Sequence, residues 1–482
     1  MLRFKVQCCL LFIILSSRAQ THHALDGSTY AGSLGIHANP ASSLSSKDTF
    51  DITIASFQLN NYSNLLKFGY APLLKKNPTL TLEPSVGDYK RSLNTNLRVN
   101  LLNTKYKFNE KNAVGFGINL RSVTNIYTGH YNLTDSVADL FEFLGQNTGS
   151  LPFRADAASS NWLEYCANFS HTFVDTRKYI LNVGGNVKLN KGLLGLEASL
   201  SNLQYQKSVF LGAEVYEAKN ADFEYGFSST VASWDNTLRL RENLRSLMKE
   251  TKSGASIDLG AELLIKNEST SDWFYEGLDY DYTWKIGVAL LDLGYARYHY
   301  YPESVATSGI KENITPDILF DKFLGTFNNI ASLNDTLATI VSNYNKLTGN
   351  FLVYHPSRLL FNIDRKLTRS IYVNAAMSMP FSFVQRANHT IVNDIGYLTL
   401  TPRVENAIVG LYFPIIFTTT TQLKLGAAMR VGPLVFGMNN WKIFNNNTDL
   451  HNQSGYLSFI FRFRKKEKKP NYNFLLSPRK VL

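Results

Sequence analysis

The chain has 482 residues, of which 44% are hydrophobic and 13% aromatic, and its formal net charge is +11. After the N-terminus, no segment approaches eighteen uninterrupted apolar residues, which excludes a bundle of membrane-spanning helices. Much of the positive charge lies in residues 464–469 (RKKEKK). Without aromatic–basic interleaving or a zinc-finger spacing, this charge does not indicate a nucleic-acid partner.

Residues 1–19 have the features of an export signal. Arg3 and Lys5 precede an apolar core at residues 8–15 (CCLLFIIL), which is too short to cross a bilayer as a helix. Small residues before Gln20 then provide a cleavage position. We expect a signal peptide at residues 1–19 and an exported protein. The alternative is a buried N-terminal strand.

Residues 20–49 are rich in Gly, Ser, Ala and His and lack the alternation of a strand. Within them, the sequence Asn39-Pro40-Ala41 predicts a turn, because Pro40 fixes its own φ and biases Asn39 towards an extended conformation. We expect residues 20–49 to form a segment distinct from the strands that follow. The turn at Asn39, Pro40 and Ala41 is its structural site.

From residue 50 to residue 464, apolar and polar residues alternate in long segments. Val114 and Phe116 alternate with Gly117 and Arg121, which places an apolar surface on one face of a strand and a small or polar surface on the other. The clearest such segments are 113–127, 162–174, 256–266, 371–379 and 455–464. The pattern predicts an all-β fold, a transmembrane antiparallel β-barrel of about 14 strands within a range of roughly 12–18. A soluble β-sandwich is the weaker alternative.

The connections fall into two groups. Tight polar turns are expected at residues 109–112, 175–178 and 365–369, with a further turn at 190–192 whose parity conflicts with the first two. Long inserts are expected at residues 128–161, 228–254, 302–356 and 385–395. Short turns at one end and long loops at the other are typical of outer-membrane barrels.

Two inserts have a helical pattern. Residues 236–251 place Leu240, Leu244 and Leu247 on one face, and residues 316–347 repeat the pattern. An amphipathic helix covers an apolar surface. We therefore expect both helices at the long-loop end, packed over the barrel mouth or into its lumen.

The C-terminal part combines an aromatic strand with a basic tail. Leu457, Phe459, Phe461 and Phe463 share one face of the last strand, a pattern that barrel-insertion machinery recognises in many outer-membrane proteins. Residues 465–482 follow as a basic tail without periodicity.

No arrangement of residues indicates catalysis or metal binding. Cys166 is the one cysteine outside the signal peptide, so we interpret it as a small side chain on one barrel face. His171 lies near Asp175 without a serine nucleophile, and Asp279 and Asp281 lack the further carboxylates of a calcium loop. We expect no enzyme, no catalytic residue, no cofactor and no metal site.

Several segments resemble a known superfamily. Residues 27–33 (GSTYAGS), followed by residues 39–41, resemble the N-terminal segment of the long-chain fatty-acid transporter (FadL-like) barrels. Residues 196–205 (LEASLSNLQY) and 286–295 (IGVALLDLGY) resemble strands of that superfamily that end in Asn/Asp-Leu-Gly. The closest resemblance is to an uncharacterised Bacteroidota outer-membrane β-barrel family, related at fold level to the FadL-like and the gliding/secretion-associated barrels. It covers nearly the whole chain and implies that residues 20–49 lie inside the barrel as a plug.

These features predict a barrel at residues 50–464 in the bacterial outer membrane. We expect it to contact outer-membrane lipid and to pass or bind a small hydrophobic ligand, with movement of the plug or a lateral gap at a kinked strand admitting that ligand. The alternative is a non-transporting barrel whose loop inserts, residues 302–356 above all, dock partner proteins in secretion, gliding or surface assembly.

Overall fold

The computed structural model describes residues 25–46, 48–69, 81–135, 140–148, 152–210, 212–235, 237–266, 282–312, 314, 329–381, 390–440 and 452–463. The expected signal peptide at residues 1–19, the tail at residues 465–482 and the carboxylates Asp279 and Asp281 lie outside the described residues. Within the described residues, no helix is both long enough and apolar enough to cross a bilayer.

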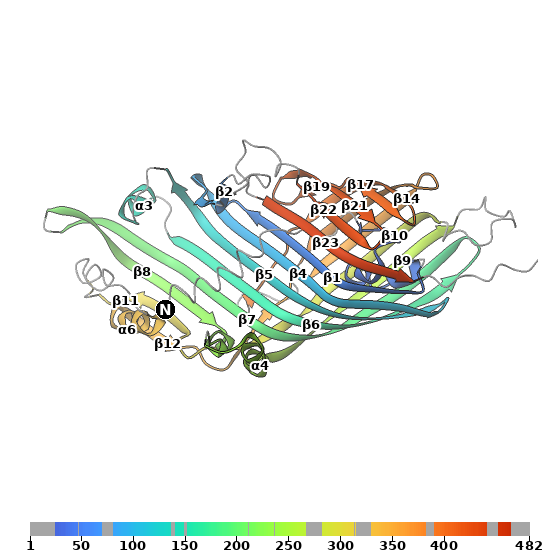
Figure 1. Ribbon diagram of the computed structural model, residues 1–482. Helices are drawn as coiled ribbons and strands as arrows, with labels where there is room; N and C mark the ends of the chain where they lie inside the picture. The colour runs from blue at the N-terminus through green and yellow to red at the C-terminus, as the bar shows by residue number, and fades with distance from the viewer. Residues whose placement is uncertain are drawn as a thin grey trace, which may run out of the picture.

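Fourteen antiparallel wall strands close into a barrel (Figure 1), which confirms the predicted fold class and strand number. The first and last strands pair directly, from Phe50 opposite Phe463 to Tyr62 opposite Asn452. In order around the wall, the strands are β1 (Phe50–Ser63), β4 (Gly87–Asn109), β5 (Asn112–Leu133), β6 (Phe153–Asp175), β7 (Tyr179–Phe210), β9 (Lys252–Lys266), β10 (Tyr282–His299), β14 (Arg358–Lys366), β15 (Ile371–Pro380), β17 (Tyr397–Glu405), β18 with β19 (Val409–Tyr412 and Ile415–Thr418), β20 with β21 (Leu423–Leu425 and Ala427–Val431), β22 (Leu434–Met438) and β23 (Asn452–Phe463).

The wall strands have an apolar outer face and a polar inner face, as the alternation predicts. On β5, Phe116 is 44% exposed whereas Asn119 and Arg121 are fully buried. On β23, the residues from Leu457 to Phe463 that share the aromatic face are exposed, and Ser458 is buried. Successive side chains of a strand point to opposite faces, so the exposed apolar residues form a continuous outer belt around the barrel.

The two ends of the barrel differ in their connections. At the short-turn end, β4 passes to β5 at residues 109–112 and β6 passes to β7 at residues 175–179, as predicted. The other end, here called the long-loop end, carries the additional elements. These are β2 (Leu66–Gly69), β3 (Thr81–Pro84), α3 (Leu140–Gln146), β8 (Ala213–Phe227), η4 (Ser229–Ser233), α4 (Leu240–Glu250), β11 (Val305–Ile310), α6 (Ile330–Ile340), β12 (Val341–Lys346), β13 (Asn350–Tyr354) and β16 (Thr390–Ile391).

The turn expected at residues 190–192 is absent. These residues lie within β7, where Asn190 pairs with Gly254 of β9 and donates a hydrogen bond to Ser256 Oγ at 3.0 Å. The β6 ladder pairs Gly192 with Trp162 and then shifts register, which is the mark of a β-bulge. The polar, glycine-containing sequence therefore encodes a bulge in a continuous strand rather than a chain reversal, and the parity conflict disappears.

The insert at residues 302–356 contains more sheet than expected. Its β11 pairs with β8, its β12 pairs with β11, and its β13 pairs with the C-terminal part of β10, from Tyr295 to His299. The helix predicted over residues 316–347 is wrong at its end, because Tyr344 lies in β12 opposite Thr307. Much of residues 316–329 lies outside the described residues.

The second predicted helix forms but does not pack as expected. Helix α4 covers Leu240–Glu250, and yet Leu240 is 65% exposed and Leu244 is 49% exposed. The side chain of Asn243 faces the protein instead, where it is buried and donates a hydrogen bond to the carbonyl of Asp235 at 2.7 Å. Leu247, the third residue of the predicted face, is partly buried, so this helix is held by a local polar contact and by one end of its apolar face only.

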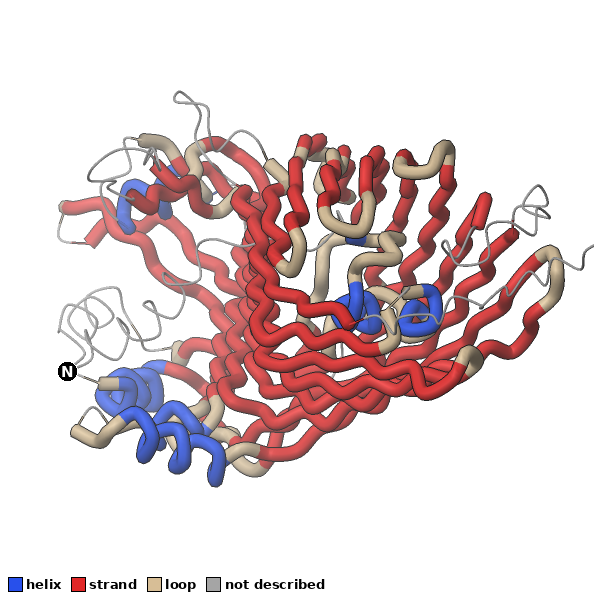
Figure 2. The backbone as a smooth tube through the Cα atoms, turned by 45° about the vertical axis from the view of Figure 1, so that its right-hand side comes forward, coloured by secondary structure: helices blue, strands red, loops and turns tan. Residues whose placement is uncertain are grey.

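Residues 25–46, here called the lumen segment, lie inside the barrel (Figure 2). The segment contains the short helices η2 (Gly32–His37) and α2 (Ser42–Ser45), and most of its residues are buried. Leu25, Ala31 and Leu34 pack against inward side chains of the wall, including Tyr412 and Tyr456. The segment therefore occupies the barrel interior near the short-turn end, with a small cavity of about 40 Å³ left between it and the wall.

Candidate functional site

The lumen segment is held by hydrogen bonds to strands on many sides of the barrel. Ser33 Oγ lies 2.9 Å from Thr53 Oγ1 of β1, and His37 Nε2 lies 2.9 Å from Asn103 Oδ1 of β4. Near the end of the segment, Ser45 donates to Glu262 of β9. Because β1 and β4 are neighbours whereas β9 lies several strands further around the wall, the segment is anchored on separate parts of the barrel.

The predicted site residues form a turn against the wall. The backbone N–H of Ala41 donates to Asn39 Oδ1 at 3.0 Å, and Asn39 Nδ2 donates to the carbonyl of Ala261 on β9 at 3.0 Å. The carbonyl of Pro40 accepts from Ser170 Oγ at 2.7 Å and from Asn168 Nδ2 at 3.1 Å. The turn thus lies between β6 and β9 and is bonded to both.

Two wall glycines give this turn the space that it occupies. A Cβ atom at Gly184 of β7 would lie 2.7 Å from the backbone of Pro40 and Ala41. A Cβ atom at Gly260 of β9 would lie 2.2 Å from Asn39 Oδ1. Both distances are shorter than any ordinary contact of a Cβ atom, so glycine is required for this close approach.

The imidazole of His37 lies in the same region. Its side chain is buried, and burial lowers the pKa of His37 to about 3, with a further lowering by the positive charge of Arg98. The ring is therefore neutral near neutral pH, and its Nε2 atom shares the hydrogen bond with Asn103 described above.

A buried ion network lies further towards the long-loop end. Arg121 of β5 contacts both carboxylate oxygens of Asp292 on β10, at 2.5 and 3.0 Å. Lys188 Nζ of β7 lies 2.6 Å from Asp258 and 2.8 Å from Asp292. Glu164 of β6 lies 3.3 Å from Arg121. Since β5 and β10 are not neighbouring strands, the Arg121–Asp292 contact reaches across the lumen at this height.

Residues 390–395 enter the lumen from the opposite end. The backbone N–H of Asn393 donates to Asn125 Oδ1 at 2.6 Å, and its carbonyl accepts from Asn94 Nδ2 at 2.7 Å. Asp394 Oδ2 accepts from Asn96 at 3.0 Å and pairs with Arg358 at 2.9 Å. The described part of this connection therefore narrows the mouth of the barrel.

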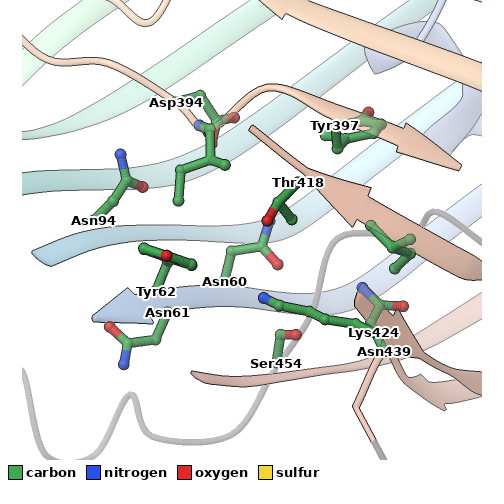
Figure 3. A pocket seen from close by; sticks show the side chains of 12 residues that line it. Asn60, Asn61, Tyr62, Asn94, Asp394, Tyr397, Thr418, Lys424, Asn439 and Ser454 are labelled. Atoms are coloured by element: carbon green, nitrogen blue, oxygen red, sulfur yellow. Dashed lines mark hydrogen bonds between the residues drawn. The ribbon is translucent and has the colours of Figure 1, made fainter. Parts of the chain in front are cut away.

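Between residues 390–395 and β1 lies a small cavity, here called the mouth pocket (Figure 3). Its volume of about 40 Å³ has room for a few water molecules. Amide and hydroxyl side chains line it together with aromatic and aliphatic ones: Asn60, Asn61, Tyr62, Asn94, Asp394, Ile395, Tyr397, Ile416, Thr418, Lys424, Asn439 and Ser454. The lining thus has both hydrogen-bonding and apolar faces.

Lys424 supplies the unbalanced charge of the mouth pocket. Its neighbours Leu423 and Leu425 are exposed on the outer face of β20, so the lysine points inward. Figure 3 shows its side chain reaching towards Tyr62, and Nζ lies 5.6 Å from the centre of that ring. Within the described residues, Nζ has no hydrogen bond and no ion pair, and Asp394 is already paired with Arg358. The pocket is therefore electrostatically suited to an anionic group.

Short breaks divide two of the wall strands beside the mouth pocket. Pro414 separates β18 from β19, and Gly426 separates β20 from β21. Nearer the short-turn end, β21 pairs with β22. Among the described residues, β20 pairs with β19 alone. The strand edge next to Lys424 thus has no described partner on its second side.

The remaining residues considered in the sequence are dispersed. Cys166 is buried and free on the inner face of β6, and His171 Nδ1 lies 2.8 Å from Asn112 Oδ1. Among the described residues, no group of three or more His, Cys, Asp or Glu side chains is placed to hold a metal ion.

Sequence reasoning placed Arg121 on the inner face but did not identify Lys188, Asp258, Asp292 or Lys424. Lys188, Asp258 and Lys424 each lie between two outward apolar neighbours, whereas Asp292 follows the buried Leu291. A charged residue between outward apolar neighbours is therefore the signal for Lys188 and Asp258, whereas the sequence around Asp292 and the three-residue strand of Lys424 carry no such pattern. Which of them meet depends on the order and register of strands around the closed barrel, which local patterns do not specify.

Comparisons with known proteins give a family and distant structural likenesses. The family model described as "Family of unknown function (DUF5723)" matches residues 40–439, and no curated protein matches the sequence. The Ralstonia pickettii toluene transporter TbuX is similar at 10% identity over 90% of this chain and 94% of that chain, with a TM-score of 0.41. The TodX deltaS2S3 mutant monoaromatic hydrocarbon channel is 10% identical over 90% and 95%, with a TM-score of 0.43. A Pseudomonas aeruginosa FadL homologue is 9% identical over 92% and 97%, with a TM-score of 0.38. These values are too low to transfer a substrate or a route to this chain.

Proposed function

Because the chain belongs to the family of unknown function DUF5723, we propose a function for it from its own geometry. The protein is a gated barrel of the bacterial outer membrane. It binds, at its long-loop end, a small ligand that has an apolar body and an anionic end. Movement of the lumen segment then lets the ligand pass towards the short-turn end.

The outer belt supports the membrane location. Exposed apolar side chains continue around the barrel, for example Leu259 on β9, Phe361 on β14 and Phe461 on β23. A closed barrel satisfies the backbone hydrogen bonds of its strands, so such a surface is compatible with a hydrocarbon environment. We assign the short-turn end to the periplasm by analogy with outer-membrane barrels.

The single observation that carries the ligand class is the position of Lys424. An inward ammonium without an anionic partner among the described residues is costly unless a ligand or solvent balances it. The neighbouring rings of Tyr62 and Tyr397 and the side chain of Ile416 offer an apolar surface beside it. The pocket volume of about 40 Å³ matches the anionic end of a ligand, and the body would lie against this apolar surface.

The lumen segment is the gate in this proposal. It occupies the barrel interior and is anchored through Asn39 and Pro40, so a conduit requires it to shift. The ion network of Arg121, Lys188 and Asp292 forms a second barrier on the long-loop side of the lumen segment. Side-chain rearrangement of this network must accompany passage.

Among the described residues, no specific contact favours the docking alternative. Within the insert at residues 302–356, β11 pairs with both β8 and β12, so these strands form part of the sheet. Asn334 of α6 accepts a hydrogen bond from Tyr225 and donates to Glu303 at 2.7 Å, so the described part of this insert is packed on its own chain.

The test compares two probes that differ in charge. Full-length protein in lipid nanodiscs is titrated with radiolabelled naphthalene-2-carboxylate and with naphthalene, and binding to empty nanodiscs is subtracted. We expect the carboxylate to bind about 10- to 100-fold more tightly, as a charge-assisted hydrogen bond predicts. Lys424→Met should abolish this preference, whereas Lys191→Met, which removes a lysine outside the pocket, should retain it. Equal binding of both probes to the unmodified protein and to Lys424→Met would overturn the ligand class.

A further inference from the structure

Helix α4 presents two adjoining faces to its surroundings. Leu240, Leu244 and Met248 are spaced by four residues and share one face, and all three are exposed. Arg241, Arg245 and Lys249 have the same spacing and share the neighbouring face, where they too are exposed. The exposed surface of α4 is therefore an apolar stripe bordered by a basic stripe.

The described residues do not cover this apolar stripe, although they partly cover the apolar stripe of α6, a helix of the same length. In α6, Leu333 and Leu337 are partly buried and Ile340 is buried against the protein. Both helices lie at the long-loop end, so solvent exposure of α4 is not a general property of that end. A face of exposed leucines in one helix of the pair indicates an apolar partner outside the chain.

The position of α4 identifies that partner. The helix ends at Glu250, and β9 begins two residues later at Lys252. Along β9, the outward residues Ile257 and Leu259 belong to the apolar belt, whereas Ser253 is exposed and polar. The belt thus ends a few residues from the helix. In Figures 1 and 2, α4 lies at the outer edge of the wall and not inside the lumen.

We propose that α4 is an interfacial helix, which lies in the boundary layer of the outer membrane at the long-loop end. Its leucine stripe enters the acyl region that the belt already occupies, and its basic stripe contacts anionic lipid headgroups. An amphipathic helix with basic residues beside its apolar face is the usual form of such an anchor. Each basic side chain near an anionic surface adds to its attraction.

Two local features suit α4 to this position. The carboxylate of Glu242 accepts a hydrogen bond from the backbone N–H of Arg239 at 3.0 Å, which caps the N-terminus without another element of the protein. Asn243 exchanges hydrogen bonds with the backbone of Asp235, at 2.7 and 2.8 Å. Because polar contacts fix the inner side, the leucine stripe is free to face lipid.

This inference rests on the membrane location proposed above and not on the ligand, so the experiment includes a reporter for each. Single cysteines carrying an environment-sensitive fluorophore are placed at Leu244 of α4, Leu259 of the belt and Ala338, an exposed position of α6, in a background without the native cysteines. The protein is reconstituted in phosphatidylcholine vesicles with or without phosphatidylglycerol. Quenching by spin-labelled lipid and by aqueous iodide is then compared.

We expect the labels at Leu244 and Leu259 to be quenched by spin-labelled lipid, and the label at Ala338 to be quenched by iodide. In vesicles with phosphatidylglycerol, replacing Arg241, Arg245 and Lys249 by glutamine should shift the Leu244 label towards water, by on the order of a hundredfold in its equilibrium. A Leu244 label quenched by iodide, or shielded from both quenchers, would overturn the inference while Leu259 still reports lipid. A Leu259 label in water would instead overturn the membrane location.

Discussion

Gly184 and Gly260 lie directly opposite each other on β7 and β9, and together they form the surface on which the Asn39–Pro40 turn rests. One glycine meets the backbone of Pro40 and the other meets the side chain of Asn39. β7 and β9 thus each have a glycine, with no side chain, at paired positions of the sheet. The contact fixes where the lumen segment sits in the barrel.

Gly184→Ala should loosen the lumen segment. The added Cβ atom would lie 2.7 Å from backbone atoms, which cannot rotate away, so the turn must shift. Overpacking of this kind costs about 1–3 kcal/mol, which predicts hydrogen exchange of residues 25–46 that is about fivefold to a hundredfold faster. Gly185→Ala is the matched control, because its Cβ atom would meet nothing closer than 3.6 Å. Equal hydrogen-exchange rates of residues 25–46 in the two variants would show that Gly184 does not hold the lumen segment in place.

Lys188→Met should destabilise the barrel. The substitution leaves Asp258 and Asp292 buried without their shared ammonium, and breaking a buried ion pair in this way costs about 3–5 kcal/mol. The measurement is the denaturant concentration at which half of the lipid-reconstituted protein is unfolded. Lys191→Met serves as the control, because the Lys191 ammonium contacts Ser253 at 2.7 Å and no buried carboxylate. Matching midpoints for both variants would show that the network does not stabilise the fold.

Acidification should weaken docking of the lumen segment through His37. The docked ring has a pKa of about 3, whereas a released histidine has its ordinary value of 6.5. The released form alone therefore takes up a proton as the pH falls below 6.5, and docking loses about 2 kcal/mol by about pH 5. The contribution of His37 to docking is therefore complete above pH 6.5, and it declines as the pH falls towards about 3, the pKa of the docked ring.

The mobility of a nitroxide spin label attached at residue 42, in α2 of the lumen segment, measures this effect. We expect greater mobility at about pH 5 than at about pH 7.5. His37→Gln cannot take up a proton at this site but retains a hydrogen-bonding partner for Asn103, so its label should respond much less. The same response in both proteins would assign the pH dependence to other groups.

The barrel could be predicted from the sequence because its signal is local. In β5, alternation alone places Phe116 outward and Arg121 inward, and the structure agrees. The prediction failed where a local signal has two structural meanings. The sequence at residues 190–192 has the composition of a turn but forms a bulge in β7, since cross-strand bonds from Asn190 outweigh its turn propensity.

The candidate site depends on relationships that local patterns do not contain. Lys424 lies in a strand of three residues, too short to show alternation, and its significance depends on Tyr62 being brought beside it by barrel closure. Asp292 meets Arg121 only because β5 and β10 face each other across the lumen. In α6, the helical pattern continues to Tyr344, but pairing with β11 converts residues 341–346 to strand.

Movement of the lumen segment is the central claim, and a reversible tether tests it most directly. The hydroxyls of Ser43 in the segment and Ser170 in β6 are hydrogen-bonded, so Ser43→Cys with Ser170→Cys, in a Cys166→Ser background, should form a disulfide. Ser56→Cys with Ser458→Cys is the control, because it joins β1 to β23 without touching the segment. Uptake of naphthalene-2-carboxylate into proteoliposomes is measured before and after reduction. The account predicts that the oxidised Ser43–Ser170 pair blocks uptake, that reduction restores it, and that the control pair has no effect. Equal uptake by the oxidised and reduced forms of the Ser43–Ser170 variant would contradict it.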